Sequence, residues 1–253
     1  MTRVAVSGAG GRMGRLVAET VATTKDLELV AGFDPAHAGT KVAGIVVSAD
    51  PTVVGEAEVV VEFTVPGVVL ENLAVWRAHG VHAVVGTSGF DESRIQAVRT
   101  AWGSGPPNCL LVPNFSIGAV LMMRFAELAA PHFSASEIIE LHHDRKVDAP
   151  SGTALTTAAR MQAAGGKQNR HVESTEVIAG ARGGDAGPRV HSVRLPGLLA
   201  HQEVILGSEG ETLTIRHDTS DRVSFMPGVL LAVRSVASLR DPVTVGLDGL
   251  LGI

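Results

Sequence analysis

The sequence predicts an α/β protein with two parts, a doubly wound parallel sheet and a second α+β domain built on an open mixed sheet. Two patterns lead to this prediction. Over roughly the first 115 residues, short apolar runs alternate with helical patterns, which is typical of stacked βαβ units. After a helical segment at residues 117–133, the β-rich runs become longer, as in a more open, partly antiparallel sheet.

The first part is predicted to be a parallel sheet covered by helices on both faces. Val, Ile, Leu and Ala fill its strands almost continuously, without the polar alternation of a sheet that faces water. A helical pattern returns at residues 226–241 and is expected to pack back on this part. We therefore expect a first domain of residues 1–114 and 222–253. Its predicted strands are residues 3–8, 27–34, 57–64, 81–88 and 108–114.

The second domain is expected to span residues 115–221. A hairpin is predicted around the turn "GSEGE" at residues 207–211. Residues 180–188 hold four glycines without apolar periodicity, which predicts a mobile loop, either a lid or a plain surface loop. The β-rich runs of this domain are residues 136–143, 171–180, 189–197 and 201–218.

Composition excludes several classes of protein. The net charge of −5 and the pI near 6.0 provide no general attraction to nucleic acid or to anionic lipid, so neither partner is expected. No apolar stretch reaches the roughly 20 residues of a membrane helix, and the N-terminus lacks an export signal. The single cysteine, Cys109, lies in an apolar run and is predicted to be a buried thiol. These features favour a cytoplasmic protein.

The run "VAVSGAGGRMGRLVAE" predicts a dinucleotide site on a Rossmann-like fold. Its glycines at 8, 11 and 14 follow a strand and open a helix, where backbone N–H groups can approach a pyrophosphate. The spacing is G-x-x-G-x-x-G, because Met13 stands at the third glycine position of the more common G-x-G-x-x-G frame. Asp34, twenty residues after Gly14, ends the next strand and is suited to accept hydrogen bonds from ribose hydroxyls. The alternative for Asp34 is a turn residue before Pro35.

Two further segments stand at the ends of predicted strands. "GTSG" at residues 86–89 and "PNFS" at residues 113–116 lie where an open α/β sheet places its ligand crevice. Their small and amide side chains suit a nicotinamide ring.

The segment "ELHHDRKVDAPSGTA" at residues 140–154 gathers proton carriers and cations before a helix start. Ser151 is a plausible N-cap, and the N–H groups of the following turn form an anion site. His142 and His143 are candidate proton donors, although they share a face only if the strand ends there. The alternative for either histidine is a structural role, as a packed or hydrogen-bonded side chain. A zinc site is disfavoured, because no i, i+4 histidine pair or Cys/His set completes it.

Together, "GAGGRMG", "GTSG", "PNFSIG" and "HHDRKVDAPSGTA" resemble the dihydrodipicolinate reductase family, and "LPGLLAHQEVILGSEGETLTIRHD" resembles its actinobacterial branch. The resemblance implies that His142 donates or accepts a proton and that Lys146 is a second donor. It also implies substrate contacts at His143, Ser151, Gly152 and Thr153. The cofactor contacts implied are Gly8, Ala9, Gly10, Gly11, Arg12, Met13, Asp34, Gly86, Thr87, Ser88, Val112, Pro113, Asn114 and Phe115.

The resemblance further implies a reaction and an assembly. The reaction is the NADH- or NADPH-dependent reduction of 4-hydroxy-tetrahydrodipicolinate to tetrahydrodipicolinate in diaminopimelate and lysine biosynthesis, with domain closure over a dicarboxylate. The assembly is a homotetramer. Some family members carry arginine where this chain has Pro35, so we expect use of both cofactors with NADH favoured over the 2′-phosphorylated form.

Two alternatives remain open at this point. Another small amino-acid dehydrogenase on the same fold would keep the glycine turn without needing the histidine–lysine segment. A dinucleotide-sensing regulator would need a nucleic-acid or partner surface, for which the acidic chain has no helix-turn-helix pattern.

Overall fold

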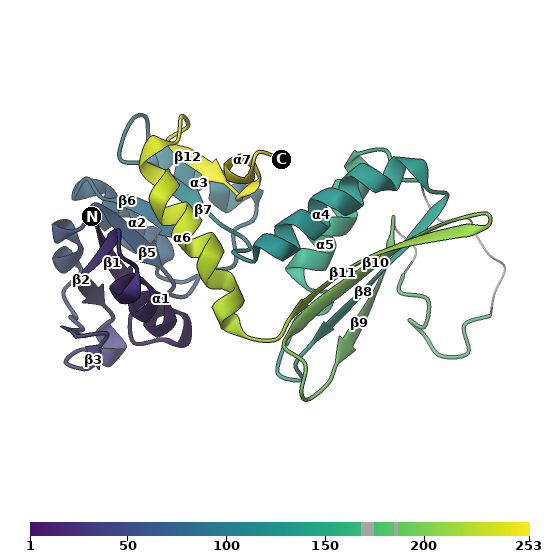
Figure 1. Cartoon of the computed structure of the whole chain (residues 1–253), viewed down its shortest axis with the longest axis horizontal. Helices are drawn as coiled ribbons and strands as arrows, with labels where there is room; N and C mark the ends of the chain where they lie inside the picture. Colours follow the sequence, from purple (N-terminus) through teal and green to yellow (C-terminus); the bar gives the residue numbers. More distant parts are fainter. Residues whose placement is uncertain (168–174, 185–186) are drawn as a thin grey trace. The chain divides into compact units, whose positions relative to one another are not determined.

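The computed structural model describes residues 1–167, 175–184 and 187–253 (Figure 1). The chain divides into two units. Unit 1 consists of Met1–Ile117 and Phe225–Ile253, and unit 2 of Gly118–Ser224. Each of the two boundaries between the units lies three residues after the expected one.

The apolar runs of unit 1 form a six-stranded sheet in which every pair of neighbouring strands is parallel. The strand order is β12-β7-β6-β5-β1-β2. Five of these strands were predicted. Four of them are shorter than their apolar runs, and β1 has the predicted length but begins one residue earlier. The strands are β1 Thr2–Ser7, β2 Leu27–Phe33, β5 Val59–Glu62, β6 His82–Val85, β7 Cys109–Leu111 and β12 Val243–Val245.

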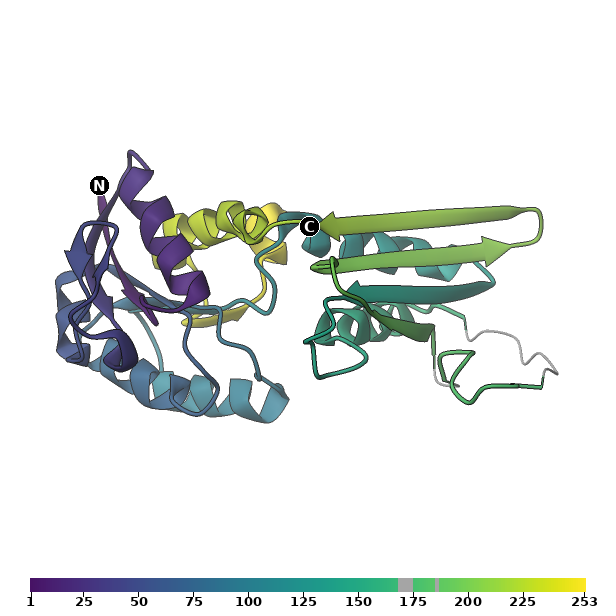
Figure 2. The same cartoon turned by 90° about the horizontal axis from the view of Figure 1, so that it is seen from below.

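Helices cover both faces of this sheet, which explains why its strands are nearly all apolar. Helix α1 (Arg12–Thr23) packs beside α6 (Met226–Ser235), and α2 (Val69–Ala78) packs beside α3 (Glu92–Trp102). Figure 2 shows these two pairs on opposite sides of the sheet. The prediction of a doubly wound, Rossmann-like fold is confirmed, as is the return of the C-terminal helix to the first part of the chain.

The C-terminal segment is tied to the sheet by polar contacts. The Asn108 side-chain amide donates hydrogen bonds to the carbonyls of Val236 (2.9 Å) and Leu239 (3.1 Å), around the 3-10 turn Val236–Ser238. Next to it, Cys109 is fully buried, and burial raises the pKa of its thiol above the usual range. The predicted buried thiol is confirmed, and its burial and raised pKa favour a structural role over a nucleophilic one.

Small elements connect the larger ones in unit 1. The sequence did not predict the short hairpin of β3 (Lys41–Val42) and β4 (Ile45–Val46). Besides η5 (Val236–Ser238), unit 1 contains the 3-10 turns η1 Pro35–His37 and η2 Pro51–Glu56, and helix α7 is Asp248–Leu251.

Unit 2 is a four-stranded mixed sheet in the order β11-β10-β8-β9. Strand β10 (Ala200–Ser208) is antiparallel to β8 (Ala135–His142) and to β11 (Glu211–Thr219), whereas β9 (Arg189–Arg194) is parallel to β8. The predicted hairpin and the mixed sheet are confirmed. Alternate residues of β8 and β10 are buried, and they pack with α4 (Ile117–Ala129) and α5 (Gly152–Ala163). That core consists of Ala126, Ala130, Ile138, Ala154, Met161, Val204 and Leu206.

The strand predicted at residues 171–180 is wrong in the part that the structure describes. Residues 175–180 form no strand, because residues 175–176 are irregular and residues 177–180 form bends and a turn. Residues 171–174 lie outside the described residues. In the predicted loop at 180–188, residues 180–184 and 187–188 are irregular, and residues 185–186 lie outside the described residues. A lid at this loop stays a prediction.

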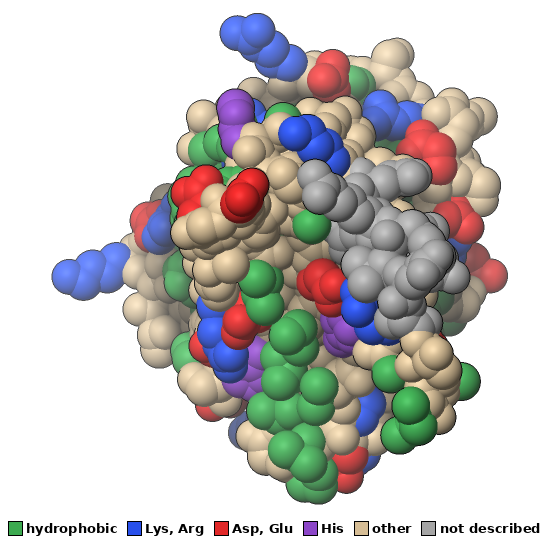
Figure 3. Space-filling model, turned by 90° about the vertical axis from the view of Figure 1, so that its right-hand side faces the viewer, with side chains coloured by type: hydrophobic (Ala, Val, Ile, Leu, Met, Phe, Trp, Pro, Cys, Tyr) green, Lys and Arg blue, Asp and Glu red, His purple; other side chains and the backbone are tan. Residues whose placement is uncertain are grey.

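The described helices were also compared with the length and hydropathy of a membrane span. None of them is both long and apolar enough to cross a bilayer. Figure 3 shows acidic and basic side chains interspersed over the face that it draws, so that face carries no field of a single sign.

Candidate active site

The glycine loop of unit 1 is built so tightly that only glycine fits. Gly8 has a φ of +78°, and a Cβ added there would lie 2.3 Å from the carbonyl oxygen of Phe63. A Cβ on Gly14, inside α1, would lie 2.0 Å from the carbonyl oxygen of Gly8. Gly11 stands at the N-terminus of α1, and no side chain caps this helix. The first turn therefore presents backbone donors and the positive end of the helix dipole.

Asp34 joins the end of β2 to the glycine loop. Its Oδ2 accepts a hydrogen bond from the Gly10 N–H (3.0 Å), and its Oδ1 accepts one from the Ala36 N–H (3.1 Å). His37 Nδ1 lies 2.9 Å from the same Oδ2. Both interpretations of Asp34 therefore have a geometric basis, because it caps the turn η1 and also reaches the loop.

His37 is a residue that the sequence interpretation missed. Its ring packs so closely on the glycine loop that a Cβ on Gly10 would lie 2.2 Å from it. The side chain of His37 remains partly exposed.

The loops after β5, β6 and β7 meet beside the glycine loop. Thr87 is buried, and its hydroxyl accepts a hydrogen bond from the Thr64 N–H (3.1 Å). The rings of Phe63 and Phe115 lie 5.4 Å apart, and a Cβ on Gly86 would lie 2.2 Å from the Phe63 ring. The structure thus joins two predicted segments through Phe63 and Thr64. The sequence contained one signal for them, since "FT" directly follows the apolar strand β5.

A buried carboxylate supports this meeting point. Glu62, the last residue of β5, is fully buried and accepts hydrogen bonds from the Trp76 indole (3.0 Å), the Asn72 amide (3.1 Å) and the Thr64 hydroxyl. These contacts hold the loop after β5 against α2.

The remaining cofactor candidates take different positions. Ala9, Val112 and Phe115 are buried, Met13 and Asn114 are partly exposed, and Arg12, Ser88 and Pro113 are exposed. Val112 continues β7 through a hydrogen bond from its N–H to the Val85 carbonyl (2.9 Å).

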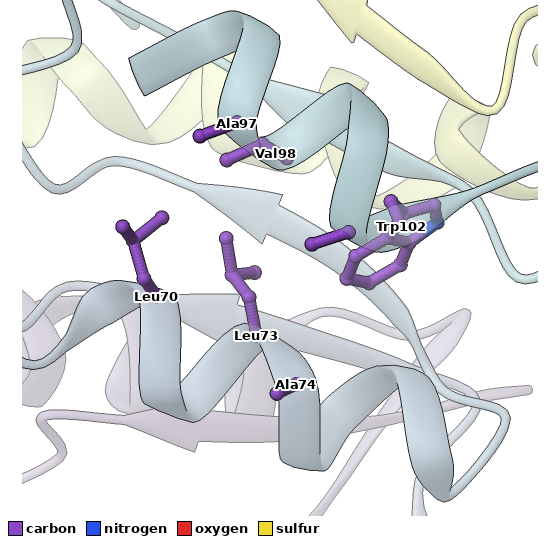
Figure 4. Close-up of a pocket in the computed structure, with 7 residues that line it drawn as sticks. Leu70, Leu73, Ala74, Ala97, Val98 and Trp102 are labelled. Atoms are coloured by element: carbon purple, nitrogen blue, oxygen red, sulfur yellow. The ribbon is translucent and has the colours of Figure 1, made fainter.

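An apolar pocket elsewhere in unit 1 does not belong to this site. Figure 4 shows Leu70, Leu73 and Ala74 of α2 facing Val98 and Trp102 of α3. Apolar side chains line this pocket, so it supplies no cation for a phosphate or a carboxylate.

In unit 2, strand β8 ends at His142, and His143 lies just beyond it. Glu140 and His142 are two residues apart and therefore share one face of the strand. Glu140 is fully buried. Its Oε2 lies 2.5 Å from His142 Nδ1 and accepts a hydrogen bond from Arg194 Nη1 (2.9 Å).

The other oxygen of Glu140 connects the strand to the start of α5. Oε1 accepts hydrogen bonds from Arg194 Nη2 (2.8 Å) and from the Ser151 N–H (3.1 Å). Ser151 is the N-cap of α5, as predicted, and its hydroxyl accepts a hydrogen bond from the Ala154 N–H (3.2 Å). Sequence interpretation missed both Glu140 and Arg194 as parts of the site.

The charges of this cluster set its protonation. Burial by itself raises the pKa of Glu140, but hydrogen bonds from Arg194, Ser192 and His142 hold that pKa below its usual range. Burial lowers the pKa of His142, and the charges of Lys146 and Arg194 act in the same direction against Glu140. Glu140 is therefore a carboxylate and His142 a neutral imidazole at neutral pH.

Lys146 and His143 stand near the same helix start in sequence. The Lys146 ammonium lies 2.8 Å from both carboxylate oxygens of Asp148, which leaves one of its three N–H groups for another partner. His143 Nδ1 is buried and has no hydrogen-bond partner among the described residues. Gly152, the first residue of α5, is exposed, and Thr153 is partly exposed. In the described parts of the chain, no three His, Cys, Asp or Glu side chains are placed to hold a metal ion.

Comparison with known proteins finds matches to both units of the chain. The family model for the N-terminus of dihydrodipicolinate reductase matches residues 2–115, and the model for its C-terminus matches residues 118–251. A 4-hydroxy-tetrahydrodipicolinate reductase from Cutibacterium acnes is 50% identical over 100% of both chains. One from Thermobifida fusca is 51% identical over 100% of both chains.

A solved structure agrees with the fold of both units. The dipicolinate-bound dihydrodipicolinate reductase from Paenisporosarcina sp. TG-14 has a TM-score of 0.84 at 36% identity, covering 98% of this chain and 99% of that one. The two alternatives, another dehydrogenase on this fold and a dinucleotide-sensing regulator, are not supported by these matches. The chain belongs to the dihydrodipicolinate reductase family, whose members are nicotinamide-dependent oxidoreductases of diaminopimelate and lysine biosynthesis.

Proposed function

We propose that this chain reduces 4-hydroxy-tetrahydrodipicolinate to tetrahydrodipicolinate, using NADH or NADPH. The observation that carries the proposal is the cluster in unit 2, where His142 and the N-terminus of α5 are both attached to the buried carboxylate of Glu140. A proton carrier is thereby held near an anion site, which a reduction of a ring dicarboxylate requires.

Unit 1 fits a nicotinamide dinucleotide. The glycine loop, closed to any Cβ at Gly8 and Gly14, and the helix start at Gly11 suit a pyrophosphate. Asp34 suits the adenosine ribose, and the loops containing Thr87 and Phe115 suit the nicotinamide end. When bound, this group supplies the hydride. The full set of contacts proposed is Gly8, Ala9, Gly10, Gly11, Arg12, Met13, Asp34, Gly86, Thr87, Ser88, Val112, Pro113, Asn114 and Phe115.

Unit 2 holds the substrate by its two carboxylates. The N–H groups of Gly152 and Thr153, with the Thr153 hydroxyl, donate hydrogen bonds to one carboxylate at the positive end of α5. The second carboxylate lies toward His143 and Lys146, whose ammonium has one N–H left after its contact with Asp148. Ser151 contributes mainly by capping the helix, because its side chain is buried and already accepts the Ala154 N–H.

His142 delivers the proton. Its imidazole is neutral in the free protein, so it takes up a proton when the two negative charges of the substrate arrive. The imidazolium then gives this proton to the ring as electrons relocalise during the reduction. Lys146 is a second donor.

A coupled assay tests the function directly. Pyruvate, aspartate semialdehyde and the synthase of the preceding step generate the substrate, and loss of nicotinamide absorbance is followed. We expect oxidation of NADH and NADPH that depends on the complete mixture. Absence of oxidation with either cofactor refutes the proposal.

We also propose that the enzyme is a cytoplasmic homotetramer. The family resemblance supports this assembly, with the sheet of unit 2 forming the contacts. Ile138 and Glu140 point to the face of the sheet that packs in the core of unit 2. The opposite face carries Ile139, Leu141 and Ile205, which are partly buried and do not belong to that core. Sedimentation equilibrium tests the proposal, which requires four times the 26.2 kDa of one chain.

A further inference from the structure

Arg194 lies 54 residues from Glu140 in sequence, yet both of its terminal nitrogens bond the two oxygens of that carboxylate. We propose that Glu140 and Arg194 are positioning residues that keep the proton of the neutral His142 on Nδ1, leaving Nε2 as the nitrogen for proton transfer. The inference rests on the proposed role of His142.

The hydrogen-bond inventory of Glu140 dictates this proton position. An ionised carboxylate only accepts hydrogen bonds, and three of its contacts come from groups that only donate, two from Arg194 and one from the Ser151 N–H. The Ser192 hydroxyl also donates a hydrogen bond to this carboxylate, and the remaining contact, His142 Nδ1, must donate as well. Among Arg194, the Ser151 N–H and His142, only His142 Nδ1 could accept a proton from Glu140, so the Nδ1 proton depends on an ionised Glu140.

Arg194 keeps Glu140 in the accepting state. Besides the carboxylate, its guanidinium donates hydrogen bonds to the carbonyls of Asp148 (2.6 Å) and Val193 (2.8 Å), which fix its plane. The charge of Arg194 offsets the cost of burying the carboxylate. Without it, desolvation favours a protonated Glu140, which would donate to His142 Nδ1 and move the imidazole proton to Nε2.

This arrangement makes the catalytic proton arrive with the substrate. Nε2 of the free enzyme is unprotonated, and it becomes protonated when the imidazole lies between Glu140 and the dicarboxylate. Transfer of that proton to the ring restores the Nδ1–H imidazole, and the reduced nicotinamide, when bound, would supply the hydride. For each ring reduced, one proton and one hydride are consumed and the 4-hydroxyl of the substrate leaves as water.

Nitrogen-15 NMR of the histidine rings at about pH 8, without ligands, tests the inference, because the two neutral tautomers have distinct ring shifts. The chain contains a reference for each tautomer. His79 Nδ1 contacts the Val75 carbonyl (2.9 Å) and must carry a proton, whereas His82 Nδ1 accepts the Asn108 N–H (2.8 Å) and must not. We expect His142 to resemble His79. A wild-type His142 that resembles His82 overturns the inference.

Glu140→Gln is the main variant. If the glutamine NH2 takes the place of Oε2, beside His142, it faces one N–H donor, Arg194 Nη1. If it takes the place of Oε1, it faces two, Arg194 Nη2 and the Ser151 N–H. We therefore expect the NH2 group to lie beside His142 and to donate to Nδ1. His142 should then carry its proton on Nε2, and kcat should fall by roughly 10²-fold or more, with NADH affinity unchanged. The double variant Glu140→Gln/Arg194→Met leaves no unpaired buried charge, and it serves as a second test if the single variant does not fold. Retention of the Nδ1 proton in the folded variants overturns the inference.

Glu127→Gln is the matched control. Glu127 also bonds an arginine of unit 2, Arg160, at 2.7–2.8 Å, but it lies on α4 away from His142 in the hydrogen-bond network. This variant should leave the His142 tautomer and kcat unchanged. The tautomer is measured without substrate. A wrong tautomer therefore contradicts only this inference, whereas absence of reductase activity contradicts only the proposed function.

Discussion

The anchoring of the substrate at the start of α5 gives a sharp prediction for Thr153→Val. Thr153 is the second residue of this helix, and valine has the same shape and a similar helix propensity, so the change removes little besides one hydroxyl. A hydrogen bond to a charged group contributes about 1.5–3 kcal/mol, which corresponds to roughly tenfold or more in an inhibition constant. Because the backbone N–H groups remain, binding is weakened and not abolished.

The assay is steady-state competition by pyridine-2,6-dicarboxylate and pyridine-2-carboxylate against substrate. In the wild type, we expect the dicarboxylate to inhibit at least roughly tenfold better, because only it engages both anchors. Thr153→Val should reduce this advantage. Thr156→Val is the control, since Thr156 is exposed on the same helix beyond its first turn. Equal inhibition by the two compounds refutes two-point anchoring, and equal effects of the two variants refute the role of the Thr153 hydroxyl.

Three further predictions concern the cofactor and the proton carrier. Titrations should show that both cofactors bind and that NADH binds at least as tightly as NADPH, because the Asp34 carboxylate repels a 2′-phosphate. If NADPH binds tenfold more tightly, about 1.4 kcal/mol, this prediction is wrong. His142→Gln should lower kcat by roughly 10²–10⁴-fold with NADH affinity nearly unchanged, and a variant with near-normal turnover moves the proton transfer to another group. Denaturant unfolding should show stability falling as the pH drops below about 6.5, because burial lowers the folded pKa of His142, so the unfolded state binds more protons there. His82 and His217 shift in the same direction, so His142→Gln should reduce this loss without removing it, and an unchanged slope contradicts the assignment.

Local patterns in the sequence predicted most elements because their causes are local. Continuous apolar runs predicted the parallel strands, since helices on both faces exclude water from them. Ser151 was predicted to cap α5, and the cap is present, because the hydroxyl and the N–H that it accepts are three residues apart. The interpretation of the two histidines depended on where β8 ends, and it ends at His142.

Predictions failed where pairing partners are distant. Strand β12 has only three residues, and it exists because the C-terminal segment pairs with β7 at the edge of the sheet. Residues 171–180 have a β-like composition, yet residues 175–180 form no strand, since composition alone supplies no neighbouring strand.

The sequence by itself determined the glycine turn of the first unit. It also placed Glu140, His142, Lys146 and Ser151 within one short segment. It did not reveal that Arg194 closes the hydrogen bonds of Glu140. That contact follows from the parallel pairing of β9 with β8, which sets Ser192 opposite Glu140 and Arg194 opposite His142. Strand register is chosen by burial and pairing over the whole sheet, and a shift of one residue would turn Arg194 to the other face. The protonation of the candidate catalytic histidine is therefore a property of the folded sheet.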